Sequence, residues 1–339
     1  MDKKNLQLLE ILAQNCRVTN TSIAKALNIS KDSVAYRVNQ LKKTDMLKQF
    51  VLFVDARRLG FTRYHILMQF EAKVEGKRLI YDKLKKHPYV MWINTFIGRF
   101  DLQIIVDAKD GFHLNQIREE LFDICNHQIK EYIILTHLFD LEFTQLLPVL
   151  DLKTKFEKKS DHSFSRLVSG RNFPVDPVFE KYSPSKSEIE ILKRLADNPR
   201  ESLISIGKQL NLDRKTVKSK ISNLIENKVI LNFGGIPNHT EFGFVTYYML
   251  VRLSQDTPAD VLRSPFQQLR NIFYAGKMIG DYDMILYLNA RNPEELNSSI
   301  EMFKSQIGEH IIHYDLLVQD KVHHWKQFSE GIYRKLKLQ

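Results

Sequence analysis

An internal repeat constrains this chain more than any other feature of its sequence. The stretch IAKALNISKDSVAYRVNQL at residues 23–41 shares its apolar skeleton with IGKQLNLDRKTVKSKISNL at residues 206–224, while the polar residues differ. A separation of 183 residues aligns Asn15 with Asn198 and Gly60 with Gly243, and after one deletion a separation of 182 aligns Gly98 with Gly280. Matches that keep register across several element types indicate duplication, since two unrelated amphipathic helices would not keep a common register.

The first part of each copy predicts a helix-turn-helix. Three short stretches carry apolar residues at helical spacing, and Asn28 stands at the tight turn before the third. Ser30 and Asp213 are expected to cap that third helix at its N-terminus. Its buried stripe is expected to be Val34, Val38 and Leu41 in copy one and Val217, Ile221 and Leu224 in copy two. The following stretches, MLKQFVLFVD and VILNFGGIP, are expected to be wing or hinge strands.

The remainder of each copy changes to a period of two residues. YHILMQFEA alternates as a strand does, and a helix is expected at about 77–86. Two strands joined at Gly98, a second helix at about 111–125 and a last strand, IKEYIILTHLF, complete a βαββαβ unit of the ferredoxin-like kind. We therefore predict an α+β fold in which two winged helix-turn-helix domains are each followed by a ferredoxin-like domain.

Domain boundaries follow from these patterns. We expect helix-turn-helix domains at residues 1–50 and 185–235, ferredoxin-like domains at 51–150 and 236–330, and a linker at 151–184. The linker is charged and contains proline and serine. Its local docking would use Phe164, Leu167 or Phe173.

Composition narrows the class of protein. The chain of 339 residues has 50 basic and 40 acidic side chains, a net charge of +10 that permits DNA, RNA or a membrane surface as partner. Its two cysteines, Cys16 and Cys125, lie far apart and outside any CxxC pattern, so neither a disulfide framework nor a zinc site is expected. We find no signal peptide and no apolar run of the ~20 residues that a membrane span needs. A cytoplasmic location is the expectation.

The segments LLEILAQNCRVTNTSIAKALNISKDSVAYRVNQL, DARRLGF, IGRFDLQIIV and IGDYDMILYL resemble those of the Lrp/AsnC family of prokaryotic transcription regulators. The resemblance covers nearly the whole chain twice, as in a tandem fusion of a regulator that usually carries one copy. Departures from the family pattern are Asn5, where a second acidic residue is common, Pro199, and Lys220 in place of an arginine. The resemblance implies binding to double-stranded DNA, an amino-acid effector, and self-association as an intrachain pseudo-dimer and a homo-oligomer.

Polar residues on the third helix of each copy are the candidates for DNA contact. Asn, Gln, Ser, Thr and Lys side chains reach base edges in the major groove, and Arg and Lys suit phosphates. A solvated helix face is the structural alternative. The candidates are Lys31, Ser33, Tyr36, Arg37, Asn39 and Gln40 in copy one and Arg214, Lys215, Thr216, Lys218 and Lys220 in copy two.

Two glycine-containing turns are the candidates for effector binding, because the resemblance places this region near the family's amino-acid pocket. Glycine permits positive φ there, and the aspartate three residues later is equally suited to bonding the local backbone. An arginine in copy one stands where copy two has Asp281, so only the first turn would attract a carboxylate. The effector candidates are Gly98, Arg99, Asp101, Gly280 and Asp283.

Competing functions remain open on the sequence alone. Siroheme decarboxylases resemble this architecture and carry an HNYxR-like segment where this chain has NTFIGRFD and AGKMIGDYD, without that His and Arg constellation. His323 and His324 have no spaced third ligand, so no metal is expected, and no cofactor or nucleophile motif is found. A DNA-binding transcription regulator that is not an enzyme is the leading hypothesis. A scaffold or co-regulator that does not bind DNA is a further one.

Overall fold

The computed structural model describes residues 2–73, 75–143, 179–255, 257–258, 261–262, 269 and 271–338. Within these residues the chain forms two compact units. Unit one comprises residues 2–55 and 182–243, and unit two comprises residues 56–143, 179–181 and 244–338. Each unit therefore contains the corresponding part of both copies. The expected linker docking residues Phe164, Leu167 and Phe173 lie outside the described residues.

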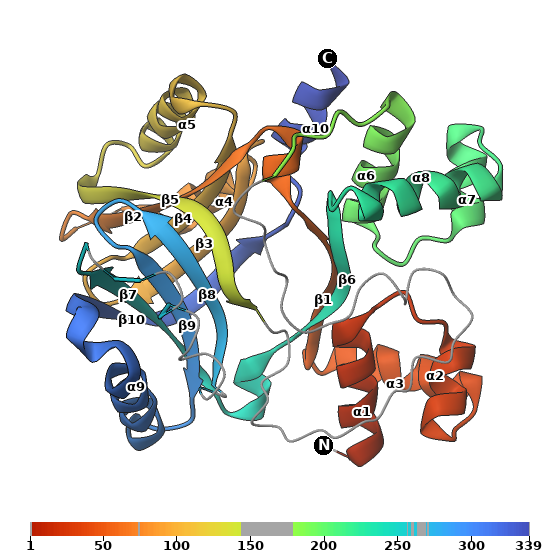
Figure 1. Cartoon of the computed structure of the whole chain (residues 1–339), viewed down its shortest axis with the longest axis horizontal. Coiled ribbons are helices and arrows are strands. Elements are labelled where there is room, and N and C mark those ends of the chain that lie inside the picture. The colour runs from red at the N-terminus through yellow and green to blue at the C-terminus, as the bar shows by residue number, and fades with distance from the viewer. Residues whose placement is uncertain are drawn as a thin grey trace. The chain divides into compact units, whose positions relative to one another are not determined.

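Unit one holds two helix-turn-helix motifs and one strand from each copy (Figure 1). Copy one contributes α1 (Lys3–Gln14), α2 (Asn20–Leu27), α3 (Lys31–Lys43) and β1 (Leu47–Val54). Copy two contributes α6 (Lys186–Asp197), α7 (Leu203–Leu210), α8 (Arg214–Glu226) and β6 (Ile230–Pro237). The six residues expected to form the buried stripes of α3 and α8 are all buried, so the predicted register of both helices is confirmed.

Local residue chemistry fixes the turns of both motifs. The predicted caps are confirmed, because the Ser30 hydroxyl accepts the Ser33 N–H at 3.0 Å and the Asp213 carboxylate accepts the Thr216 N–H at 2.9 Å. Asn28 ends α2 with φ of 52°. Its counterpart Asn211 ends α7 with φ of 53°, a left-handed conformation that asparagine tolerates better than most residues.

The strands expected to be wings or hinges pair with one another. β1 and β6 form a two-stranded antiparallel ribbon in which Phe50 lies opposite Gly235 and Leu52 opposite Phe233 (Figure 1). This register is the one that a local two-fold axis would produce. Val51 and Gly234, which are equivalent in the repeat, pair at its centre.

Equivalent arginines join the two motifs on either side of this ribbon. Arg17 donates hydrogen bonds to the carbonyl oxygens of Pro199, at 2.6 Å, and Glu201, at 2.9 Å. Its counterpart Arg200 donates to Asn20 Oδ1 at 3.0 Å. The two guanidinium groups also stack reciprocally, Arg17 on Phe233 and Arg200 on Phe50. The duplicated motifs of unit one therefore pair as a pseudo-symmetric dimer.

Unit two is built on one antiparallel sheet of eight strands that closes on itself (Figure 1). Copy one supplies β2 (Thr62–Phe70), α4 (Lys77–Leu84), β3 (Val90–Ile97), β4 (Leu102–Ala108), α5 (Gly111–Ile124) and β5 (Ile129–Phe143). This order is the predicted βαββαβ. Copy two supplies β7 (Val245–Leu253), β8 (Ile272–Ile279), β9 (Met284–Ala290), α9 (Pro293–Ile307) and β10 (Ile311–Trp325). The predicted α+β class is confirmed.

The two copies of unit two meet along reciprocal strand pairs. β3 pairs with β10 and β5 pairs with β8, so each copy offers the same two edges to the other. Helices α4 and α5 pack on the core of copy one, and α9 packs on the core of copy two. A third apolar cluster, drawn from both copies, fills the space between the two halves of the sheet.

Two further features complete the described residues. A C-terminal helix, α10 (Glu330–Lys337), was not among the predicted elements, and it buries Ile332 and Leu336. Its short amphipathic repeat lies beyond the region covered by the duplication, which explains why the repeat gave no indication of it. Among the residues that the structure describes, no helix combines the length and apolar content needed to cross a bilayer.

A buried imidazole inside unit two predicts acid sensitivity. His65 is 1 % exposed. Burial, followed by His137 and Arg63, lowers its pKa well below the ordinary value. Near pH 6.5 the His65 imidazole is therefore protonated in the unfolded chain but stays neutral in the folded chain, so stability falls as pH drops below that value. Each pH unit in this range costs about 1.4 kcal/mol for this histidine.

We expect the melting temperature measured from pH 7.5 to pH 5 to fall less steeply in His65→Gln than in the wild type. Glutamine keeps a hydrogen-bond acceptor near Gln103 but does not titrate. A residual slope is expected from His324, whose pKa burial and nearby lysines lower to about 4. Parallel pH profiles for the two proteins would show that His65 is not the acid-sensitive group.

Candidate nucleic-acid interface

The outward face of α3 presents a compact set of side chains to solvent. Lys31, Tyr36 and Asn39 are exposed, and Tyr36 has 64 % of its surface accessible. Ser33 and Gln40 lie half-buried beside them. An exposed tyrosine flanked by an amide and a lysine can combine base-edge contacts with a phosphate contact.

Arg37 is held differently from the other candidates of α3. Its Nη1 bonds Asp2 Oδ2 and Asn5 Oδ1, both at 2.6 Å, and these contacts tie α3 to the start of α1. The hydrogen bond from Arg37 lowers the pKa of the Asp2 carboxyl. A phosphate contact from Arg37 would have to compete with this ion pair.

The equivalent face of α8 is more basic. Arg214, Lys215 and Lys218 are exposed. Thr216 is committed to the helix cap, because its hydroxyl donates to Asp213 Oδ2 at 2.7 Å. Lys220, the counterpart of Arg37, lies half-buried with its Nζ 3.4 Å from the Ser185 hydroxyl.

One residue assigned to the outward face of α8 points elsewhere. Helical periodicity places Asn223 on this face, away from the core, but its side chain bonds the Tyr182 hydroxyl at 2.6 Å and Glu188 Oε1 at 2.8 Å. Helical periodicity could not reveal this, because Tyr182 belongs to the segment that precedes α6. The outward face of α8 therefore offers fewer free amides than the periodicity predicts.

The two glycine-containing turns, residues 97–101 and 279–283, have the conformation expected of glycine. Gly98 has φ of 145° and Gly280 has φ of 143°. A Cβ at Gly98 would lie 2.9 Å from Leu317 Cδ2, and one at Gly280 would lie 2.8 Å from the Ile134 carbonyl oxygen. Each glycine thus lets its turn approach the last strand of the other copy.

The aspartates that follow bond the backbone of their own copies. Asp101 Oδ2 accepts the Phe70 N–H at 2.9 Å, and Asp283 Oδ2 accepts the equivalent Leu253 N–H at 2.9 Å. Lys277 lies 3.4 Å from the other Asp283 oxygen. These bonds hold the turns in place, and a role for either aspartate in effector binding stays a prediction.

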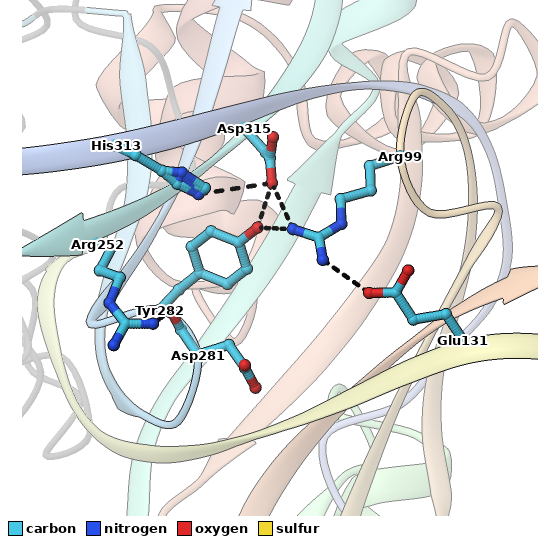
Figure 2. A network of polar contacts seen from close by, with 7 residues as sticks. All are labelled: Arg99, Glu131, Arg252, Asp281, Tyr282, His313 and Asp315. Carbon is cyan, nitrogen blue, oxygen red and sulfur yellow. Dashed lines mark hydrogen bonds and ion pairs between the residues drawn. The ribbon is translucent and has the colours of Figure 1, made fainter.

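Arg99 joins the two copies through a polar network (Figure 2). Its Nη1 lies 2.8 Å from the Tyr282 hydroxyl and 3.1 Å from Asp315 Oδ2, and its Nη2 lies 2.7 Å from Glu131 Oε1. Tyr282 in turn donates to Asp315. The turn of copy two, with Asp281, makes no equivalent network in Figure 2, where Arg252 reaches only the Asp281 carbonyl oxygen, at 3.4 Å.

Sequence reasoning did not identify several of these partners. Tyr282 and Asp315 were absent from the candidate residues because their contacts with Arg99 cross the repeat. Glu131 belongs to the same copy as Arg99 but lies 32 residues further along the chain. One available signal was the change from Ile133 in copy one to Asp315 at the equivalent position, where a charged residue replaces an apolar one.

Comparison with protein families and curated proteins gives a consistent picture for one copy. A family model described as winged helix-turn-helix DNA-binding matches residues 1–48. An uncharacterized HTH-type transcriptional regulator of Pyrococcus furiosus is 30% identical over 155 residues, which are 45% of this chain and 97% of that protein. The HTH-type transcriptional regulator LrpA of Pyrococcus horikoshii is 26% identical over 129 residues, 38% of this chain and 86% of its own. Each relative thus corresponds to a little under half of the chain.

Comparison with solved structures adds a likeness over the full length. The siroheme decarboxylase NirDL, in complex with an iron-uroporphyrin III analogue, aligns with 98% of this chain and 97% of its own, with a TM-score of 0.60. Sequence identity in this alignment is 13%. The likeness is therefore one of fold, and it extends over nearly the full length of both chains.

Proposed function

Since this chain belongs to the Lrp/AsnC family of helix-turn-helix transcription regulators, we propose that it binds double-stranded DNA through α3 and α8 together and regulates transcription in the cytoplasm. The observation that carries this proposal is the pairing of both helix-turn-helix motifs within unit one. Two recognition helices related by a local two-fold axis are the arrangement that dimeric regulators use to read two half-sites. A single chain would supply both.

The exposed side chains of the two helices suit different kinds of DNA contact. On α3, Tyr36 and Asn39 are suited to base edges and Lys31 to phosphate. On α8, Lys215 and Lys218 supply charge with little base-edge specificity. We therefore propose a strongly sequence-selective half-site under α3 and a weakly selective one under α8.

Salt dependence tests the charged part of this interface. The logarithm of duplex affinity should fall linearly with the logarithm of salt concentration, with a slope of about −0.9 per phosphate contacted. Lys31→Ala and Lys218→Ala should each weaken binding to all sequences and make the slope shallower by about 0.9. Fluorescence anisotropy at several salt concentrations measures both quantities.

Lys130→Ala is the matched control, because Lys130 is exposed on β5 of unit two and outside both recognition helices. It should leave affinity and slope unchanged. Absence of duplex binding at low salt, or an affinity that ignores salt, would contradict the proposed function.

Response to an amino acid is the second part of the proposal. The two glycine-containing turns would contribute Gly98, Arg99 and Asp101 from copy one and Gly280 and Asp283 from copy two. Asp101→Asn and Asp283→Asn keep an oxygen that accepts the Phe70 and Leu253 N–H groups, but they remove the charge that would hold an ammonium group. We expect both variants to lose any amino-acid-dependent change in DNA affinity while binding DNA normally without effector.

Calorimetry against the common amino acids checks this prediction, with DNA affinity measured in the presence and absence of each. If the wild type gives no heat of binding and no amino acid changes its DNA affinity, the turns serve only to hold the two copies together. Self-association of whole chains into a homo-oligomer is proposed on the family's behaviour, and light scattering with and without amino acid measures it.

A siroheme-decarboxylase-like enzyme is the alternative function, and we propose no catalytic reaction for this chain. Arg99 already bonds Glu131 and Asp315, so any ligand carboxylate, from siroheme or from an amino acid, would have to compete with these ion pairs. Burial raises the pKa of the Cys16 and Cys125 thiols to about 12, which makes both poor nucleophiles at neutral pH. An absorbance titration with siroheme should show no saturable change, and saturable binding followed by release of carbon dioxide would favour the enzyme.

A further inference from the structure

The two halves of unit two carry different polar side chains at the positions where they meet. β3 and its turn face β10, and β8 and its turn face β5, so the two strand pairings across the halves are related by the repeat. Apolar counterparts are similar, as the approach of Gly98 to Leu317 and of Gly280 to Leu135 shows. Polar residues at repeat-related positions are not similar. They form two networks of contacts between the halves, an outer one and an inner one.

The outer network is the one drawn in Figure 2, centred on Arg99. Arg99 of copy one receives Asp315 and Tyr282 of copy two. The counterpart of Arg99 is Asp281, and the counterpart of Asp315 is Ile133. The repeat-related contact would therefore join an aspartate to an isoleucine, and no ion pair can form there.

The inner network is buried between the halves. Asn94 Nδ2, on β3 of copy one, donates to the Tyr248 hydroxyl of copy two at 2.9 Å, and that hydroxyl lies 3.3 Å from Gln319 Oε1. Asn94 is 0 % exposed and Tyr248 is 1 % exposed. Buried polar groups of this kind cost stability unless they are hydrogen-bonded.

The counterparts of the inner network do not reproduce it. Gly276 stands at the position equivalent to Asn94, and a Cβ there would collide with the Tyr274 hydroxyl. His65 is the counterpart of Tyr248 and His137 that of Gln319. His65 bonds Gln103 of its own copy, and the distance between His65 Nδ1 and Gln103 Nε2 is 3.2 Å. His137 bonds Asp140 of its own copy at 2.9 Å.

We propose that these two networks make the pairing of the two halves of unit two heterotypic. The surface of a copy-one half then recognises a copy-two half and rejects a second copy-one half. Two copy-two halves would place Asp281 against Asp315 and leave the Tyr248 hydroxyl without the Asn94 amide. Two copy-one halves would set Arg99 against Ile133. The pairing of two copy-two halves loses an ion pair and a buried hydrogen bond, which amounts to roughly tenfold or more in the pairing equilibrium. The pairing of two copy-one halves loses the ion pair.

A double-mutant cycle in the full chain tests the outer network. Arg99→Met and Asp315→Asn should each lower the urea midpoint of the unfolding of unit two. Arg99→Met should change the unfolding equilibrium constant by a certain factor in the wild type. In the Asp315→Asn background that factor should be at least threefold smaller, as expected for residues in direct contact. Asp281→Asn is the matched control, since it makes the same chemical change at the other turn, and it should leave the midpoint unchanged.

A second cycle, Asn94→Ala with Tyr248→Phe, tests the inner network with conservative changes and should show a coupling of the same sign and larger size. Additive effects in both cycles, or an Asp281→Asn effect equal to that of Asp315→Asn, would overturn the proposal. The measurements need no DNA. Failure of the proposed DNA binding would leave them unaffected, and failure of the cycles would leave the DNA-binding proposal intact.

Discussion

Selection from random duplexes with the wild-type protein should yield an asymmetric operator, and the Tyr36→Ala/Asn39→Ala variant should lose sequence preference in one half of it only. The reason is that α3 and α8 present different side chains although unit one pairs them symmetrically. A good contact to a base edge contributes about 1–3 kcal/mol, so loss of two contacts should lower affinity for the preferred operator on the order of 100-fold.

The matched control is Ser219→Ala/Ser222→Ala, which changes the equivalent positions of α8. Because serine hydroxyls there offer weaker contacts than Tyr36 and Asn39, this variant should lose at most a few-fold in affinity, in the other half-site. A palindromic wild-type motif from which the α3 variant loses both halves equally would mean that two chains dock through copy one alone. Copy two would then serve as a scaffold.

Arg17→Ala should destabilise unit one strongly. Its guanidinium is the donor to the buried carbonyl groups of Pro199 and Glu201, and truncation leaves both without that donor. An unsatisfied buried acceptor costs about 1–3 kcal/mol, so we expect a loss of roughly 3 kcal/mol in the free energy of unfolding. Because these bonds join the two helix-turn-helix motifs, the variant should also bind a two-half-site operator little better than a single half-site.

Arg200→Ala is the built-in control for this prediction. Arg200 occupies the equivalent position but donates to a side-chain oxygen, Asn20 Oδ1, which can rotate to bond water when the arginine is removed. Urea unfolding of both variants, with operators of one and two half-sites, separates stability from coupling. Equal losses for the two variants would show that the arginine–aromatic stacking they share, and not the carbonyl contacts of Arg17, holds the motifs together.

Much of this architecture follows from local sequence signals. The left-handed turns at Asn28 and Asn211, the caps at Ser30 and Asp213 and the positive φ of Gly98 and Gly280 depend on the conformational preferences of single residues. The helical stripe of Val34, Val38 and Leu41 depends on a period that is visible in a short stretch of chain. Such features are encoded where they occur, so the repeat predicted them in both copies.

The same signals could identify which residues of α3 face outward, but not what each side chain contacts. Arg37 lies on the expected face, yet its guanidinium bonds Asp2 and Asn5, thirty or more residues earlier. Asn223 turns toward Tyr182 for a similar reason. A long polar side chain has many accessible rotamers, and the choice among them depends on neighbours that only the folded chain brings close.

The sequence by itself determined that this protein consists of two copies of one regulator-like unit, because the repeat, the caps and the strand period are local. Only the tertiary structure decided how the copies combine. β1 pairs with β6, β3 pairs with β10 and β5 pairs with β8. The sequence of a single strand does not specify which other strand it pairs with. Strand edges are alike in their backbone groups, so the choice depends on side chains distant in sequence, and Arg99 beside Asp315 and Asn94 beside Tyr248 are two such pairs.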